Sequence, residues 1–239
     1  MPNPKQSYSR LQGQLSQLIA SMPSGGQLPS EPDLAKKLSV SRATLREAMR
    51  TFEGQGLIRR RQGVGTFVVG TVPMMDNGLE VLQSIEKLAA GKGLKISMGD
   101  LRISRVPADE VMAKIFNIPA NTDVIYVERV ILADGHPIAY LVDRLPENVL
   151  THADLEEGFT GSVLDLLIER GSPQLSKSYT EINAVAATPE LAKALQIQRG
   201  DVLERLVGRL YDIEGRVIDF SGSYFLPGYF KFHVVRRIG

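Results

Sequence analysis

The chain has 239 residues, of which 43% are hydrophobic and 23% are charged, as in an ordinary globular protein. It contains no cysteine, which excludes disulfide frameworks and thiolate metal sites and fits a reducing cytoplasm. The formal net charge of +1 hides an asymmetry, because residues 1–72 carry 10 Lys/Arg against 4 Asp/Glu while residues 73–239 carry 18 against 23. We expect only the basic first part to meet a polyanion.

The N-terminal sequence MPNPKQSYSR lacks the apolar core of a signal peptide. Apolar runs elsewhere stay shorter than the roughly 18 residues that a membrane span needs. The sequence therefore predicts a cytoplasmic protein with no membrane partner.

Two helices are predicted near the start of the chain. Apolar residues recur at helical spacing from about Tyr8 to Met22, and a Pro-Ser-Gly-Gly cluster ends this pattern. A second helix begins at Ser30, whose hydroxyl can cap it, with Asp33 three residues further on. Pro32 falls in the first turn, where a missing N–H costs little.

A third helix is predicted over residues 41–50, after a short break. Arg42, Arg46 and Arg50 are four residues apart, so they line one flank beside an apolar stripe, and Thr44 lies on the other flank. A helix that reads the major groove of DNA enters it by the N-terminal end, where Arg and Thr can reach base edges and phosphates. This pair of short helices therefore predicts a helix-turn-helix.

Residues 56–69 predict two short strands around a glycine turn. Arg60 and Gln62 lie on the basic first strand, and Gly63 and Gly65 mark the turn. Basic strands with a bare-backbone tip form a wing that can lie on phosphates or enter the minor groove. Each feature alone is more typical of a small helical domain with a solvated basic face, but their order together favours a winged helix-turn-helix.

Over about residues 5–69 the chain resembles the DNA-binding domain of the GntR family. The matching runs are Leu28-Pro29-Ser30-Glu31, Val40-Ser41-Arg42-Ala43-Thr44-Leu45-Arg46-Glu47-Ala48, Gly56-Leu57-Ile58 and Gln62-Gly63-Val64-Gly65-Thr66-Phe67-Val68. The resemblance implies that the recognition helix contacts DNA and that the glycines shape the wing tip. The residues that we predict to bind DNA are Ser30, Ser41, Arg42, Thr44, Arg46, Arg50, Arg60, Gln62, Gly63 and Gly65.

One position departs from this family. Its members usually have Arg or Lys after the Glu of the Leu-Pro-Ser-Glu run, and that side chain often touches DNA. Here the position holds Pro32, which has no such donor. We expect that contact to be missing.

Beyond residue 70 the pattern changes. The segment 71–78 has the Pro, Asn and Gly of a linker, and 79–90 has the spacing of an amphipathic helix. Alternating segments at 101–106, 124–131 and 137–145 then predict strands, the last two joined by a hairpin turn at Asp134-Gly135.

An internal repeat with an offset of about 80 residues organises this second half. Each copy predicts a helix followed by a hairpin, with turns at Asp134-Gly135 and Glu214-Gly215. A helix near Ser162–Arg170 and a strand near Leu175–Val185 separate the copies. Two copies are too few for a solenoid, so the repeat predicts a pseudo-symmetric antiparallel sheet with helices packed on it.

This pattern resembles the UTRA ligand-sensing domain, a chorismate-lyase-like fold, of the HutC branch of the GntR family. The predicted fold class is α+β. We expect a winged helix-turn-helix domain over residues 5–70, a linker over 71–78, and a UTRA-type domain for effector binding and dimerisation over 79–239.

The resemblance also suggests effector contacts. Members that sense phosphosugars use an Arg-x-Arg pair, a Glu and a Ser-x-Tyr, of which this chain retains only Arg129 and Ser162. In the second copy, Asp219 matches the Glu and Tyr224 lies nearby. Tyr140 and Tyr179 are candidate ligand stackers or rim aromatics. Glu181 is a candidate ligand contact or a structural ion-pair partner. A phosphate site typically contains several arginines and N–H donors. The candidate residues of this chain therefore imply a less charged or more apolar effector.

The sequence carries no motif typical of an enzyme. The three histidines are isolated, and no dinucleotide, Walker-type or nucleophile-elbow motif occurs, so we expect no metal, no cofactor and no catalytic site. The sequence predicts a homodimeric repressor that binds double-stranded operator DNA and is released by an unidentified small molecule. The alternatives are a DNA-binding dimer without an effector, and a lyase-like enzyme with a DNA-binding appendage.

Overall fold

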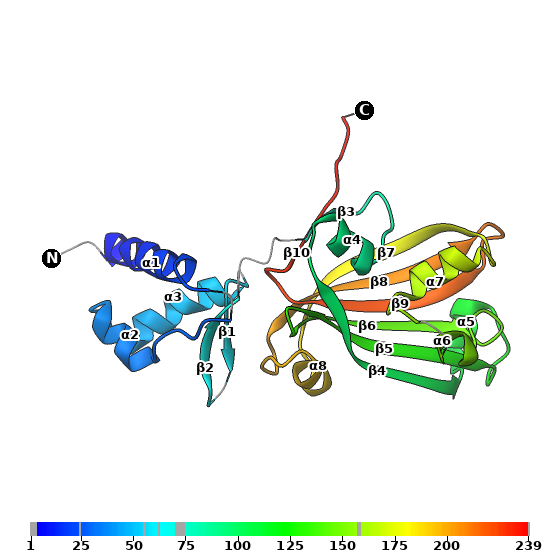
Figure 1. Cartoon of the computed structure of the whole chain (residues 1–239), viewed down its shortest axis with the longest axis horizontal. Coiled ribbons are helices and arrows are strands. Elements are labelled where there is room, and N and C mark those ends of the chain that lie inside the picture. The colour runs from blue at the N-terminus through cyan, green and yellow to red at the C-terminus, as the bar shows by residue number, and fades with distance from the viewer. Residues whose placement is uncertain are drawn as a thin grey trace. The chain divides into compact units, whose positions relative to one another are not determined.

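A computed structural model describes residues 4–23, 25–54, 56–61, 63–69, 75–156 and 159–238 (Figure 1). The chain divides into two compact units. The first comprises Met1–Met74 with Ala186–Val202 and Pro227–Phe230, and the second comprises Met75–Val185, Leu203–Leu226 and Lys231–Gly239. Within the described ranges, no helix has the length and apolar character needed to cross a membrane.

Three helices begin the first unit: α1 (Pro4–Ala20), α2 (Glu31–Lys37) and α3 (Arg42–Gly54). The predicted cap of α2 is confirmed, because the Ser30 side chain accepts a hydrogen bond from the Asp33 N–H. The helices enclose one apolar core, to which α3 contributes the stripe predicted from its spacing. The residues of α3 in this core are Leu45, Ala48, Met49 and Phe52.

The predicted wing is also confirmed as a two-stranded antiparallel ribbon. Strand β1 (Ile58–Arg61) pairs with β2 (Gly65–Val68). Gly63 has a φ of 74°, a left-handed conformation that glycine adopts without steric cost. Gly65 has a φ of 144°, which residues with a Cβ rarely adopt, so this position also favours glycine.

The second unit begins differently from the prediction. The described end of the expected linker is a strand, β3 (Met75–Gly78), which pairs with β10 (Phe230–His233). The following helix α4 (Ile85–Gly91) begins six residues later than the expected Leu79, because Ser84 caps it by accepting a hydrogen bond from the Lys87 N–H at 3.1 Å.

A six-stranded sheet, ordered β4-β5-β6-β9-β8-β7, confirms the predicted repeat. The first copy runs through β4 (Ile96–Pro107), α5 (Glu110–Phe116), β5 (Asp123–Ala133) and β6 (His136–Pro146). The second runs through β7 (Leu175–Ala186), α8 (Pro189–Ala194), β8 (Val202–Asp212) and β9 (Val217–Phe225). Because each copy is strand, helix, hairpin, and β6 pairs with β9, the strand order is palindromic with respect to the repeat.

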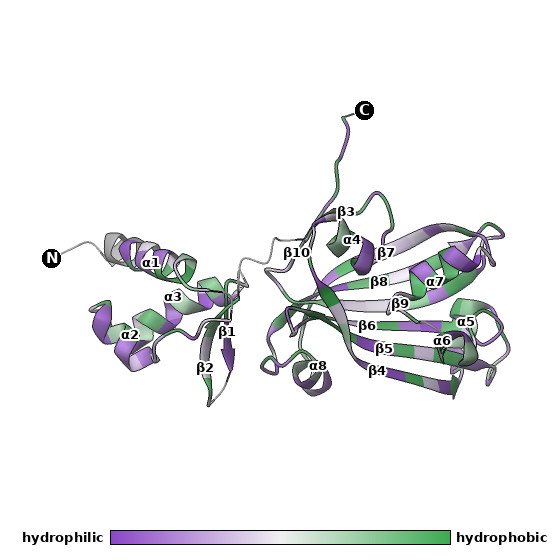
Figure 2. Cartoon of the chain, viewed as in Figure 1, coloured by the Kyte–Doolittle hydropathy of each residue, from purple (hydrophilic) through white to green (hydrophobic). Residues whose placement is uncertain are grey.

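Two short helices lie between the copies, α6 (Ala153–Glu156) and α7 (Val163–Arg170). Leu155 of α6 and Leu167 of α7 are buried against one face of the sheet, together with Ile125 and Leu145. We call this the inner face. Phe116 of α5 packs with residues of the opposite, outer face, and Figure 2 shows hydrophobic and hydrophilic residues interspersed along the strands.

Alanine substitutions at two glycines of this unit should change the stability of the protein in opposite directions. Gly135, in the β5–β6 turn, has a φ of 75°, so we expect Gly135→Ala to destabilise the protein by about 1 kcal/mol. Gly91 closes α4 with open space around its Cβ position, so Gly91→Ala should stabilise it by about 0.5 kcal/mol. Urea unfolding of the full chain measures both. Equal changes in the free energy of unfolding for the two substitutions would contradict this dependence on backbone conformation.

Candidate functional site

The N-terminal turn of α3 presents polar side chains to solvent. Ser41 caps the helix by accepting a hydrogen bond from the Thr44 N–H at 3.1 Å, and the two hydroxyls lie 2.8 Å apart. Arg42, Thr44 and Arg46 are exposed. The buried stripe on the other side of α3 fixes this orientation, so the predicted recognition surface is free of the domain's own core.

Glu31 connects this surface to the wing, a role that the sequence did not reveal. Its carboxylate accepts from Nε of Arg46 at 3.0 Å and also pairs with the guanidinium of Arg60. A carboxylate between two guanidiniums orients both. The signal was available in the Leu-Pro-Ser-Glu run, since Glu31 opens α2, but its partners lie 15 and 29 residues further along the chain.

Three other predicted DNA contacts have more local surroundings. Ser30 is the cap of α2, which makes its first role structural. Arg50 is exposed and lies 3.4 Å from Glu47, a surface pair that leaves it available. Gln62 lies outside the described residues.

A cavity of about 680 Å³ opens on the inner face of the sheet. It lies against the segment that leads into α4, the start of α7, and strands from both copies of the repeat. This volume suits a small organic ligand. Of the predicted effector residues, it brings together Arg129, Ser162 and Asp219.

A buried charge cluster forms the polar part of this cavity. The guanidinium of Arg129 pairs with the carboxylate of Asp143, and both residues are buried. Burial raises the pKa of the Asp219 carboxyl well above its usual range, and the neighbouring Asp143 raises it further. Burial likewise raises the pKa of Glu86. Asp143 and Glu86 line the cavity but were not predicted from the sequence.

The start of α7 is held by a second polar group of residues. Ser162 caps the helix by accepting from the Asp165 N–H at 3.0 Å. The Asp165 carboxylate in turn accepts from the Ser84 hydroxyl at 2.6 Å and lies 2.7 Å from Nζ of Lys87. These contacts tie the N-terminal ends of α4 and α7 together, so Ser162 has a structural role at the cavity wall.

Four predicted effector residues lie on the outer face instead. Along a strand, neighbouring residues point to opposite faces, so Tyr140 and Tyr224 face away from Leu141 and Ser223, which line the cavity. The Tyr140 hydroxyl donates to Glu128 at 2.8 Å, and burial and this bond raise its pKa. Tyr179 and Glu181 are similarly separated from the cavity, and both lie beside Arg209.

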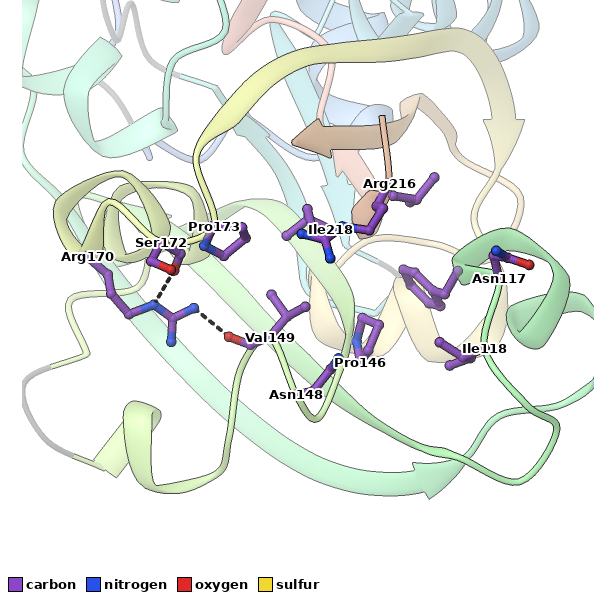
Figure 3. A pocket seen from close by; sticks show the side chains of 12 residues that line it. Asn117, Ile118, Pro146, Asn148, Val149, Arg170, Ser172, Pro173, Arg216 and Ile218 are labelled. Atoms are coloured by element: carbon purple, nitrogen blue, oxygen red, sulfur yellow. Dashed lines mark hydrogen bonds between the residues drawn. The ribbon is translucent and has the colours of Figure 1, made fainter. Parts of the chain in front are cut away.

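A second cavity of about 540 Å³ lies between the end of α5, the segment after β6 and the start of β9 (Figure 3). Its two arginines are engaged within the protein. Arg170 donates to the carbonyl oxygens of Ser172 and Val149, as the dashed lines show, and Arg216 pairs with Asp212 at 2.7 Å. Because both guanidiniums already bind groups of the protein, we regard the first cavity as the stronger ligand site.

Comparison with known families agrees with both halves of this description. The model of the family "Bacterial regulatory proteins, gntR family" matches residues 7–68, and that of the "UTRA domain" matches residues 91–231. The chain belongs to the UTRA-containing GntR family. It is therefore a transcription regulator with a helix-turn-helix and an effector-binding type of domain, and its α+β fold class is confirmed.

Several named relatives cover most of the chain. It is 26% identical over 212 residues to the HTH-type transcriptional repressor NagR of Bacillus subtilis, covering 88% of this chain and 86% of that protein. It is 28% identical over 196 residues to the histidine utilization repressor of Pseudomonas putida, covering 81% and 77%. These relatives are repressors by name.

Solved structures show the same fold. The crystal structure of PhnF from Mycobacterium smegmatis aligns with a TM-score of 0.65 at 23% identity, covering 96% of this chain and all of that one. YydK from Bacillus subtilis aligns with a TM-score of 0.56 at 18% identity, covering 97% and 99%.

Proposed function

We propose that this GntR-family protein is a homodimeric repressor that binds operator DNA in the cytoplasm and leaves it when a small molecule occupies the inner-face cavity. The observation that carries the DNA-binding proposal is the exposed turn from Ser41 to Arg46, which a buried stripe presents outward. We propose that Arg42 and Arg46 reach guanine edges or phosphates, and that Thr44 contacts the adjacent sugar-phosphate backbone of the DNA. The names of the relatives support repression rather than activation.

Two copies of the recognition helix would read the half-sites of a pseudo-palindrome about one helical turn, roughly 34 Å, apart. We propose that the second unit supplies the dimer. The effector would act by binding more tightly to one arrangement of the two DNA-binding domains than to the other, since a ligand shifts an equilibrium only through differential affinity.

The cavity favours a sensor over a DNA-binding dimer without an effector. It has the size of a ligand site, and it contains a buried arginine and buried carboxyl groups that a purely structural domain does not require. The lyase-like enzyme remains the other alternative. Likeness of fold does not transfer an activity, and among the described residues no group of three His, Cys, Asp or Glu side chains could hold a metal.

The test begins with selection of operator sequences from a random DNA library by the full-length protein. We expect a pseudo-palindrome, bound by a dimer, whose complex dissociates when a cavity ligand is added. Fluorescence anisotropy of the labelled operator measures both steps. A monomeric complex on an asymmetric site would contradict the dimer, and a cavity ligand without any effect on operator affinity would contradict the sensor.

A further inference from the structure

The charged side chains that line the inner-face cavity are mostly acidic. Asp143, Asp219 and Glu86 contribute carboxyl groups from β6, β9 and α4, and Arg129 contributes a guanidinium from β5. Glu80 also lines the cavity, but its carboxylate accepts a hydrogen bond from the Val235 N–H. Lys177 also belongs to the lining, but its ammonium lies 5.7 Å from the ring of Tyr211. Tyr211 follows Leu210, which lines the cavity, so this ammonium lies on the outer face. Among the described lining residues, Arg129 is thus the one cation that meets the three carboxyl groups.

The other charged residues near the cluster do not change this balance. Asp165 of α7 adds a further carboxylate, which Lys87 neutralises at 2.7 Å. The backbone N–H of Arg144 donates to Asp219 at 3.1 Å but carries no charge. Arg129 is already paired with Asp143, so Asp219 and Glu86 have no cation of their own in this group.

A second observation points to a ligand rather than to a purely internal network. Arg129 is 4% exposed and lines the cavity, and its Nε has no hydrogen-bond partner among the described residues. A buried N–H without an acceptor is costly unless something that enters the site accepts from it. The same wall carries the hydroxyl groups of Ser221 and Ser223, which suit a ligand with polar substituents.

We propose that the effector carries a protonated amine, which the carboxylates of Asp219, Asp143 and Glu86 bind, and an uncharged oxygen that accepts from Nε of Arg129. This inference rests on the proposed function, since it names the class of ligand for the same cavity. A phosphate or free carboxylate is disfavoured, because its charge would repel the ionised forms of Asp219 and Glu86 and would meet an arginine whose charge is already offset. A protonated amine instead supplies the positive charge that the ionised carboxyl groups lack.

The free N–H groups at the start of α7 are the strongest argument for an anion in this cavity, because helix N-termini attract negative charge. Asp165 already places a carboxylate in the first turn of this helix, and Ser162 caps it. The attraction is therefore largely satisfied within the protein. It leaves room for a hydroxyl of the ligand but adds little for a second anion.

Binding of an amine should also be linked to a proton. The raised pKa of Asp219 means that this carboxyl holds a proton at pH values where it is ordinarily ionised. An ammonium group prefers the ionised form, so its binding releases that proton to the solvent. Affinity should rise by up to about tenfold per pH unit while Asp219 titrates, and it should level off above that range.

The experiment uses thermal unfolding of the full-length protein with matched sets of probes at millimolar concentration. One set is aminopentanol, pentanediol and hydroxypentanoate, and another is glucosamine, glucose and glucose 6-phosphate. We expect the amine of at least one set to raise the melting temperature more than its neutral and anionic partners. Calorimetry in buffers of different ionisation enthalpy then measures the released proton.

Two variants assign the effect to this cluster. Asp219→Asn imitates the protonated acid and keeps its hydrogen bonds, and Glu86→Gln provides a second, less buried position. Each should reduce the affinity for the amine at least tenfold, and Asp219→Asn should also remove the proton release. Glu110→Gln, at the exposed start of α5, removes a carboxylate away from the cavity and should change neither.

The outcomes separate this inference from the proposed function. Preferential binding of an anionic or neutral probe that Leu141→Arg blocks would overturn the amine but leave the cavity as the effector site. The absence of any shift from the amines would also overturn the amine. If, in addition, no probe that binds the protein changed operator affinity, the sensor would fail with it. An amine effect that survives both cluster variants would place its site elsewhere.

Discussion

Arg42→Ala and Arg46→Ala should each weaken operator binding by about 1–3 kcal/mol, or roughly 5- to 150-fold, if they contact base edges. Both side chains are exposed at the N-terminal part of α3, the end of a recognition helix that enters the major groove. Neither substitution should unfold the domain, because the buried residues of α3 are untouched and exposed ion pairs contribute little to stability.

Fluorescence anisotropy at several salt concentrations distinguishes two kinds of contact. Loss of a base contact lowers the affinity for the operator more than the affinity for random DNA. Loss of a phosphate contact lowers both affinities and reduces the slope of log affinity against log salt concentration by about one. Lys114→Ala is the matched control, since it removes an exposed cation of α5 in the second unit. Operator affinity that is unchanged in both arginine variants would refute the proposed recognition helix.

Arg46 should differ from Arg42 in one respect. It shares Glu31 with Arg60 of the wing, so its loss leaves Glu31 to pair with Arg60 alone. We therefore expect Arg46→Ala to disturb contacts of the wing as well, and the two single effects not to be additive when Arg60 is also replaced.

The elements that sequence reasoning placed well are those with local signals. The cap at Ser30, the stripe of α3 and the glycine turns of the hairpins depend on residues a few positions apart. The internal repeat was predicted correctly for a related reason, since each copy carries its own helix and hairpin. Sequence order then left few ways to arrange two such copies in one antiparallel sheet.

The misplaced elements depend on distant partners. Met75–Gly78 has the composition of a linker and becomes a strand because β10, more than 150 residues later, pairs with it. The start of α4 was placed too early because apolar residues before Ser84 continue the helical spacing while lining the cavity instead. Propensity cannot settle such cases, because pairing and burial decide them.

The sequence predicted part of the set of residues that line the inner-face cavity. Arg129, Ser162 and Asp219, predicted by resemblance, line the inner-face cavity, whereas Tyr140, Tyr179, Glu181 and Tyr224, also predicted as effector contacts, lie on the outer face. Strand parity contained this information, since Tyr140 and Leu141 must point to opposite sides. Asp143 could have been found by the same rule, being two residues from Leu141. Glu86 could not, because its approach to the cluster depends on how α4 packs.

Arg129→Met should destabilise the folded protein by about 3–5 kcal/mol, the largest change in stability that we expect from a single substitution here. The guanidinium is the partner of a buried carboxylate, and its removal leaves Asp143 beside Asp219 without a cation. Methionine fills much of the same volume, so the deficit measures the unpaired charge rather than a void. Urea unfolding of the full chain, followed by circular dichroism, provides the free energy.

The control for this effect is a pair on the surface of the same sheet. Arg102 lies 3.8 Å from Glu128 with 78% of its side chain exposed, so Arg102→Met should change stability by no more than about 0.5 kcal/mol. Adding Asp143→Asn to Arg129→Met should recover most of the loss, because both members of the pair are then uncharged. The double-mutant cycle isolates their coupling. If the double variant is as unstable as Arg129→Met, the arginine stabilises the domain by packing its aliphatic stem, and the charge cluster is not what holds this wall of the cavity.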